Sequence, residues 1–200
     1  MNVWLAGASG LVGSEWLREF PGGVLFGRKP MAHAGWLWRS WEALDGCEER
    51  ADVALCALGT TLKAAGSREA FRAVDHDLVV RFARAAHRAG ARGFGVVSAV
   101  DADARSKIFY NRVKGEMEEA VRAIGFKSLV IARPSLLLGE RGERRFLEGL
   151  GQSLLRPLRF AFVGPAVKYR PVEGSRVAQV LARETLKLIP GVRILEGADL

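Results

Sequence analysis

The feature that most constrains the fold is an abrupt change of pattern within the first twenty residues. NVWLAGASGLVGSEWLREF, residues 2–20, passes from a short apolar run through a cluster of glycines into helical periodicity. This order predicts a strand, a tight turn and a helix whose apolar face carries Trp16 and Phe20. Such a turn lets the backbone approach a pyrophosphate, and the free N–H groups at the helix N-terminus favour phosphates. If the glycines do more than form an ordinary tight turn, the phosphate site is lined by Gly7, Ala8, Ser9, Gly10, Leu11, Val12 and Gly13.

The rest of the chain alternates between short apolar runs and longer amphipathic stretches. This alternation predicts right-handed crossovers and a doubly wound parallel sheet with helices on both faces, a three-layer α/β/α fold. Ligands in such sheets bind beyond the carboxyl ends of the strands. We expect strands at 22–30, 51–61, 93–100, 128–134 and 192–197, and helices at 68–90, around Tyr110, near 143–155 and near 174–188. The stretch 35–46 is ambiguous and is read as a third strand that passes into a turn.

Length and composition bound the class of protein. With 200 residues, 49% of them hydrophobic, we expect one dinucleotide-binding domain over residues 1–200, with a short C-terminal extension on the substrate side. The apolar runs are far shorter than the ~18 residues of a membrane helix, and the N-terminus lacks a secretory pattern. Cys47 and Cys56 lack metal-ligand spacing, and the three histidines are dispersed. These observations favour a cytoplasmic protein with no membrane anchor and no metal site.

The net charge of +8 raises the question of nucleic-acid binding. Arginine outnumbers lysine 23 to 7, and the arginines are scattered along the chain rather than gathered in blocks. We therefore expect no nucleic-acid partner. A basic face could equally favour an anionic small molecule, and most of these side chains read as a solvated surface.

The residues after the second predicted strand bear on the choice of cofactor. An NAD site normally has an acid about twenty residues after the glycine turn, where it accepts from the ribose 2′-hydroxyl. This chain has Gly27, Arg28 and Lys29 there and no acid. A guanidinium can bind a 2′-phosphate through two hydrogen bonds, so the sequence favours NADP over NAD. The alternative is that Arg28 is a surface cation on a loop.

A tyrosine and a lysine share one face of a predicted helix in SKIFYNRVKGEMEE, residues 106–119. Tyr110 and Lys114 are four positions apart, and the ammonium favours the phenolate form of its neighbour. Ser98, at the end of a buried strand, is placed to hold a carbonyl oxygen beside the phenol. A tyrosine and a lysine at this spacing also occur by chance in many helices. Together with the glycine turn, the three residues predict a proton-transfer site.

At this point several motifs resemble one family. GASGLVG, ALGTT, VVS followed by YNRVKGEMEE, and RPSLLLG are similar to the short-chain dehydrogenase/reductase superfamily, in the atypical, extended-like branch that includes the mammalian HIV Tat-interacting protein. The resemblance implies a Rossmann fold and NADP(H), with Tyr110 as general acid/base and Ser98 positioning a substrate carbonyl. It also implies that Lys114 binds the nicotinamide ribose and lowers the pKa of Tyr110. Further residues implied to lie beside the cofactor are Leu58, Gly59, Thr60, Arg133, Pro134 and Ser135.

Three features depart from the family pattern or leave a role open. The family often has two serines where this chain reads Ser98-Ala99, and if the second is the working hydroxyl, Ser106 is the nearby substitute. The acid that usually follows the third strand is not evident near Arg39. Asp75 matches the family pattern, with a helix-packing role as plausible as a functional one.

The resemblance implies an NADP(H)-dependent oxidoreductase that reduces a small carbonyl compound. Only 65 residues follow Ser135, which leaves little chain to enclose a large substrate. The alternative is an NADPH-binding regulatory or scaffold protein with little or no turnover, because fold alone does not fix function. Either protein could be a monomer or a homodimer.

Overall fold

A seven-stranded parallel sheet forms the centre of the protein in a computed structural model that describes residues 1–139 and 164–200. The strand order is β3-β2-β1-β4-β5-β6-β9, and every neighbouring pair is parallel. The order reverses direction between β1 and β4, the position where open α/β sheets bind their ligands. The predicted doubly wound sheet is confirmed. The strands are β1 (Val3–Ala6), β2 (Gly23–Phe26), β3 (Trp36–Arg39), β4 (Val53–Cys56), β5 (Gly93–Val97), β6 (Ser128–Arg133) and β9 (Gly191–Glu196).

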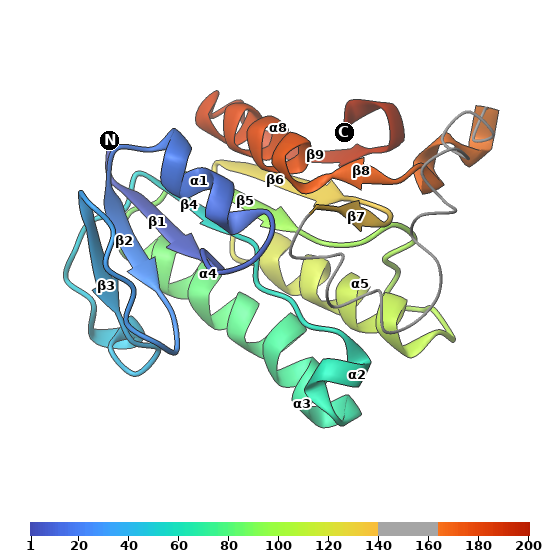
Figure 1. The fold of residues 1–200 in the computed structure, drawn as a ribbon, viewed down its shortest axis with the longest axis horizontal. Helices are drawn as coiled ribbons and strands as arrows, with labels where there is room; N and C mark the ends of the chain where they lie inside the picture. The colour runs from blue at the N-terminus through green and yellow to red at the C-terminus, as the bar shows by residue number, and fades with distance from the viewer. Residues whose placement is uncertain (140–163) are drawn as a thin grey trace.

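Helices cover both faces of this sheet (Figure 1). On one face, α1 (Gly13–Glu19) packs beside α8 (Gly174–Leu186), and the indole Nε1 of Trp16 donates to the carbonyl oxygen of Ala178 at 3.0 Å. On the other face lie α4 (Val79–Arg88) and α5 (Phe109–Arg122). Phe82 of α4 packs there against the rings of Trp4 and Phe94. Both faces of the central strands are therefore buried, which explains their continuous apolar runs.

The predicted helix over 68–90 is helical but not uniform. It consists of α3 (Arg68–Arg72), a π-helical segment η2 (Ala73–Leu78) and α4. Gly90 ends it in the left-handed conformation with φ +99°, as the sequence predicts for a C-terminal cap. A π-helical segment inside a helix is rare and often marks a functional position. Nothing in the periodicity of the sequence distinguishes it from ordinary α-helix.

The other elements are short and serve mainly to connect. The open prediction at 35–46 resolves into β3 followed by the turn η1 (Leu44–Gly46), and α2 (Leu62–Ala65) precedes α3. A two-stranded sheet of β7 (Leu137–Leu138) and β8 (Val172–Glu173) was not predicted, and η4 (Gly164–Tyr169) and η5 (Gly197–Asp199) complete the described elements. The helix predicted near 143–155 lies outside the described residues. Across 1–139 and 164–200, the helices are too short or too polar to span a bilayer.

Candidate functional site

The glycine turn after β1 is shaped by close backbone contacts. Gly7 has φ +87°, and a Cβ placed there would lie 2.5 Å from the carbonyl oxygen of Ala57. A Cβ on Gly13 would collide with the carbonyl of Gly7. The N–H of Gly10 donates back to the Gly7 oxygen at 2.9 Å, which closes the turn. Positions 7 and 13 therefore accept only glycine, because the turn packs directly against the backbone after β4 and against itself, the close packing that a dinucleotide-binding turn requires.

Arg28 and Lys29 follow β2 at the same edge of the sheet as this turn. Both side chains are exposed, and within the described part of the chain neither forms an ion pair. β2 is the direct neighbour of β1, so the two cations lie one strand away from the glycine turn. This position suits the predicted contact with a 2′-phosphate, which stays a prediction. Arg39, after β3, is instead bound to Glu49.

The segment after β4 links the predicted cofactor side to the interior. The N–H of Ala57 donates to the carbonyl oxygen of Ala6 at 2.9 Å, which brings Leu58, Gly59 and Thr60 alongside the glycine turn. The backbone N–H of Thr60 donates to Oδ2 of Asp75 at 2.8 Å. The loop expected to pass beside the cofactor is therefore fastened to the π-helical segment.

Ser98 comes directly after β5, at the carboxyl end of the sheet. Its backbone N–H donates to the carbonyl oxygen of Ala132 at 2.7 Å, so it is held next to the end of β6. The residue is only 4% exposed, and among the described residues its hydroxyl has no hydrogen-bond partner. A buried hydroxyl without a partner costs free energy in a folded chain. Ser98 therefore has a free donor at the point where the sequence predicts a substrate carbonyl.

Tyr110 and Lys114 lie on the first two turns of α5. Tyr110 is partly buried and its ring centroid is 5.4 Å from that of Phe71. Gly115 lets the connection after Ser98 cross directly over the helix, because a Cβ there would collide with the backbone at Asp103. The close crossing explains how a residue at a strand end and two residues on the following helix come to the same edge of the sheet.

The ammonium group of Lys114 is buried and paired. Lys114 is 3% exposed and Asp75 is 1% exposed, and Nζ lies 2.7 Å from Oδ1 of the carboxylate. Burial by itself lowers the pKa of Lys114, but attraction to Asp75 and then to Tyr110 outweighs it, so the pKa stands above its ordinary value. The role of Asp75, which the sequence left open, is thus to partner Lys114. In the sequence, Asp75 stands four residues from the apolar Phe71 and Val79, a position that indicates a buried side chain but does not identify its partner.

The residues after β6 are engaged by the protein itself. The guanidinium of Arg133 donates to both carboxylate oxygens of Glu118, at 2.9 and 2.7 Å, and Glu118 is 2% exposed. The carbonyl oxygen of Pro134 accepts from the N–H of Val100 at 3.0 Å, and the hydroxyl of Ser135 donates to the carbonyl oxygen of Arg170. These contacts hold the end of β6 in place. Their predicted position beside the nicotinamide stays a prediction.

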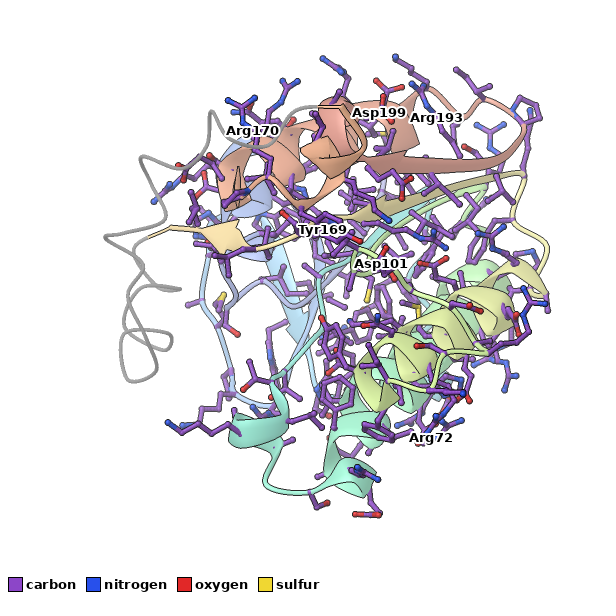
Figure 2. All side chains as sticks on the ribbon, turned by 90° about the vertical axis from the view of Figure 1, so that its right-hand side faces the viewer. Arg72, Asp101, Tyr169, Arg170, Arg193 and Asp199 are labelled. Carbon is purple, nitrogen blue, oxygen red and sulfur yellow. The ribbon has the colours of Figure 1, made fainter. Side chains whose placement is uncertain are left out.

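A polar contact that the sequence did not predict joins two distant segments near this edge. Asp101 has φ +58°, unusual for a residue other than glycine, and accepts from Nζ of Lys168 at 2.6 Å and from the hydroxyl of Tyr169 at 2.8 Å. Figure 2 shows Asp101 and Tyr169 next to one another. The hydrogen bond from Lys168 is the main reason that the pKa of Asp101 is lowered. The contact fastens η4 to the connection that follows Ser98.

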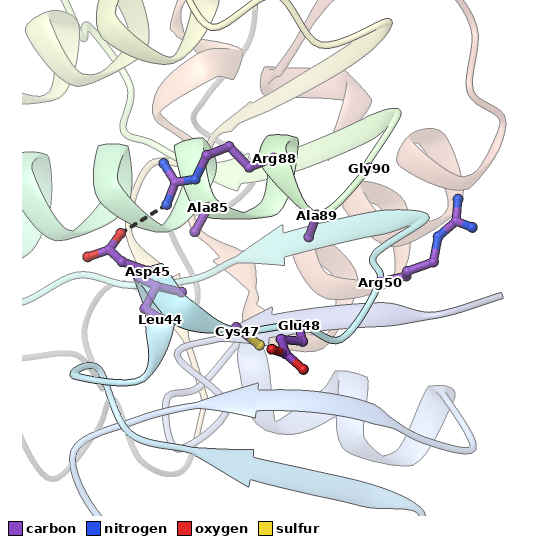
Figure 3. Close-up of a pocket in the computed structure, with 9 residues that line it drawn as sticks. All are labelled: Leu44, Asp45, Cys47, Glu48, Arg50, Ala85, Arg88, Ala89 and Gly90. Atoms are coloured by element: carbon purple, nitrogen blue, oxygen red, sulfur yellow. Dashed lines mark hydrogen bonds and ion pairs between the residues drawn. The ribbon is translucent and has the colours of Figure 1, made fainter.

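A cavity of about 400 Å³ lies at the opposite end of the sheet (Figure 3). It is found where α4 ends and β4 begins, since the N–H of Ala51 donates to the carbonyl oxygen of Ala89 there. Volume alone would place a ligand in this cavity. The glycine turn, the buried ammonium and the Ser98 hydroxyl, which has no partner in the described part of the chain, all lie at the carboxyl end instead, and we assign the site there. The cavity is lined by Leu44, Asp45, Cys47, Glu48, Arg50, Ala85, Arg88, Ala89 and Gly90.

Solved structures with the same architecture define the class of fold. MoeE5 in complex with UDP-glucose and NAD superimposes with a TM-score of 0.71 at 15% identity, over 98% of this chain and 75% of that one. The human epimerase family protein SDR39U1 with NADPH gives 0.67 at 18% identity, over 97% and 73%. The fold is therefore a Rossmann fold, as the motifs predict.

Sequence relatives then identify the particular family, although no family model matches the chain. Protein FMP52, mitochondrial, of Candida albicans is 31% identical over 224 residues, covering 100% of this chain and 96% of that protein. Protein FMP52-1, mitochondrial, of Scheffersomyces stipitis is 32% identical over 199 residues, covering 90% and 86%. The chain belongs to the FMP52 family. With the fmp52 protein of Emericella nidulans the identity is 44%, but the match spans only 50% of this chain and 43% of the relative.

The cytoplasmic localisation predicted from the sequence is contradicted by these relatives, all three of which are named as mitochondrial. The prediction depended on two cysteines without metal spacing and on the lack of a secretory pattern. Both are compatible with more than one compartment, so they could not decide between the cytoplasm and an organelle.

Proposed function

We propose that the protein is an NADP(H)-dependent oxidoreductase that reduces a small carbonyl compound, with Ser98, Tyr110 and Lys114 as its site. The observation that carries the proposal is the buried hydroxyl of Ser98, which has no partner among the described residues and follows β5 at the carboxyl edge. The backbone around Gly7 and Gly13, where a Cβ cannot fit, suits a dinucleotide pyrophosphate. Arg28 and Lys29, both exposed at the same edge, would meet a 2′-phosphate.

The nicotinamide group, when bound, supplies a hydride, and the side chains of this protein supply orientation and a proton. The hydroxyl of Ser98 would donate a hydrogen bond to the substrate carbonyl oxygen and fix its direction. The phenol of Tyr110 would protonate that oxygen as negative charge develops on it. The ammonium of Lys114, four residues along the same helix, would stabilise the phenolate that remains. Release of product and return of a proton to Tyr110 would complete the cycle.

The proposal is tested by binding and turnover measured side by side. Purified protein should bind NADPH more tightly than NADH, and it should oxidise NADPH in the presence of a member of a panel of small aldehydes, ketones and quinones. Tyr110→Phe should reduce turnover at least a hundredfold while leaving NADPH affinity within about twofold, because the phenol acts on the substrate. Arg28→Ala should remove most of the preference for NADPH over NADH.

Matched variants make these results specific. Tyr169→Phe changes the chain's other tyrosine, which binds Asp101. It should keep most of the turnover. Arg84→Ala removes an exposed arginine from α4 and should keep the cofactor preference. Tight NADPH binding without turnover on the whole panel would contradict the reductase and favour the regulatory or scaffold alternative. Equal affinity for the two dinucleotides would contradict the role of Arg28.

A further inference from the structure

An acidic side chain occupies the apolar stripe of the helix over 68–90. Asp75 lies between Phe71 and Val79, which are four residues away on either side and fully buried. Its own exposure is 1%, and it belongs to the π-helical segment η2. A carboxylate buried to this extent loses its hydration, which is unfavourable unless both oxygens find strong partners. In ordinary helix packing an apolar residue would stand at this position at no such cost.

Both oxygens of this carboxylate are engaged by groups of the proposed site. Oδ1 lies 2.7 Å from Nζ of Lys114, and Oδ2 accepts from the backbone N–H of Thr60 at 2.8 Å. Lys114 belongs to the proposed proton-transfer group, and Thr60 to the loop expected beside the cofactor. Gly59 lies next to this junction, since a Cβ there would be within contact distance of the carboxylate, at 3.4 Å, and of the ammonium, at 3.8 Å. One side chain thus joins the two halves of the site.

The pair also determines the charge state of the lysine. The groups that act on the Lys114 ammonium are Asp75 from η2, Tyr110 from α5 and the thiol of Cys56 from β4. Of these, the carboxylate of Asp75 exerts the strongest attraction, with Oδ1 at 2.7 Å from Nζ. A lysine buried without such a partner loses its proton far below its ordinary pKa.

We propose that Asp75 is a positioning residue that keeps Lys114 protonated and fixes it relative to the loop at Thr60. The inference rests on the proposed function for the meaning of Lys114, but its central claim concerns the ion pair itself. A neutral Lys114 could not stabilise a phenolate at Tyr110. Without Asp75, therefore, Lys114 would lose its charge and its fixed position relative to the loop at Thr60.

The charge state can be measured directly in the full chain. Protein labelled with ¹³C at lysine Cε gives one resonance for each of its seven lysines, and Lys114→Met assigns the signal of Lys114. In the unsubstituted protein, Lys114 should titrate above its ordinary pKa of 10.5. In Asp75→Asn it should titrate below that pKa, because burial then acts without the carboxylate. Asp77→Asn, which changes an exposed carboxylate two residues away, should leave the Lys114 titration unchanged.

A second variant separates charge from position and does not depend on Asp75→Asn folding. Asp75→Glu retains the negative charge but moves it by one methylene, so Lys114 should stay protonated. Where turnover is found, Asp75→Asn should move the alkaline limb of kcat to lower pH and Asp75→Glu should not. A Lys114 signal in the unsubstituted protein that titrates below the ordinary pKa of 10.5 would overturn the proposal, as would a signal unchanged in Asp75→Asn. These resonances report on the proposal even if no substrate is ever reduced.

Discussion

The two ends of the parallel sheet differ in how deeply their charged side chains are buried. At the carboxyl end, Asp75 and Lys114 form an ion pair that is almost completely buried. At the amino end, Asp45 pairs with Arg81 and Arg88, and all three side chains are exposed by 41% or more. Figure 3 shows the pair of Asp45 with Arg88 at the edge of the cavity. The charged groups at the carboxyl end therefore lose most of their hydration on folding, which is unfavourable in free energy. Those at the amino end keep much of their hydration, and their desolvation free energy is small.

The comparison shows that a cavity and the side chains suited to chemistry can lie at opposite ends of the same sheet. The cavity at the amino end results from the way η1 and the end of α4 meet the sheet, and its ionic groups need no ligand to be satisfied. At the carboxyl end, the hydroxyl of Ser98 has no partner among the described residues, and the turn at Gly7 and Gly13 is packed so closely that only glycine fits. Uncompensated polar groups and absent side chains indicate a ligand more specifically than an open space does.

The largest difference between the two ends should appear when one acid is removed from each. Asp75→Ala leaves the buried ammonium of Lys114 without its carboxylate, and the free energy of unfolding should fall by about 3–5 kcal/mol. Asp45→Ala breaks exposed pairs and should lower it by about 1 kcal/mol or less. Urea denaturation of the two variants at pH 7 measures both values. Equal losses would show that the buried and exposed pairs contribute alike, against the comparison.

A smaller difference is expected for two glycines, one at each end. Gly13→Ala places a Cβ against the backbone of Gly7 and Ala8, and backbone atoms cannot move aside easily. We expect it to destabilise the protein by roughly 1–3 kcal/mol and to weaken NADPH binding at least tenfold. Gly46→Ala, in η1, meets no atom within 4 Å and should change neither quantity appreciably. Thermal unfolding and a fluorescence titration with NADPH test both variants, and unimpaired NADPH binding by Gly13→Ala would contradict the assignment of the turn.

The sheet could be predicted from the sequence because its signals are local and repeated. Continuous apolar runs such as ADVALCALGTT predict buried parallel strands, and the glycines after β1 predict the turn. The ion pair of Asp75 with Lys114 could not be predicted, because the two residues are 39 positions apart and meet only once η2 packs on α5. The contact of Asp101 with Lys168 and Tyr169 is longer in range still, and no periodicity marks it.

The smallest expected difference concerns pH, where the two ends should weaken at opposite extremes. Lys114 has a pKa raised above 10.5, so its stabilisation is complete below that pH and is lost as the pH rises through the higher folded pKa. Asp45 has a pKa lowered from 3.8, chiefly by its hydrogen bond with Arg81, so its stabilisation is complete above pH 3.8 and is lost as the pH falls through the lower folded pKa.

Unfolding measured across the pH range separates these two contributions. The stability difference between the unsubstituted protein and Lys114→Met should narrow on the alkaline side, above pH 10.5. The difference from Asp45→Asn should narrow only on the acid side and should shrink with added salt, because this pair is exposed and screened. An alkaline loss that is the same in Lys114→Met and in the unsubstituted protein would mean that the buried ammonium contributes nothing, and the contrast between the two ends of the sheet would fail.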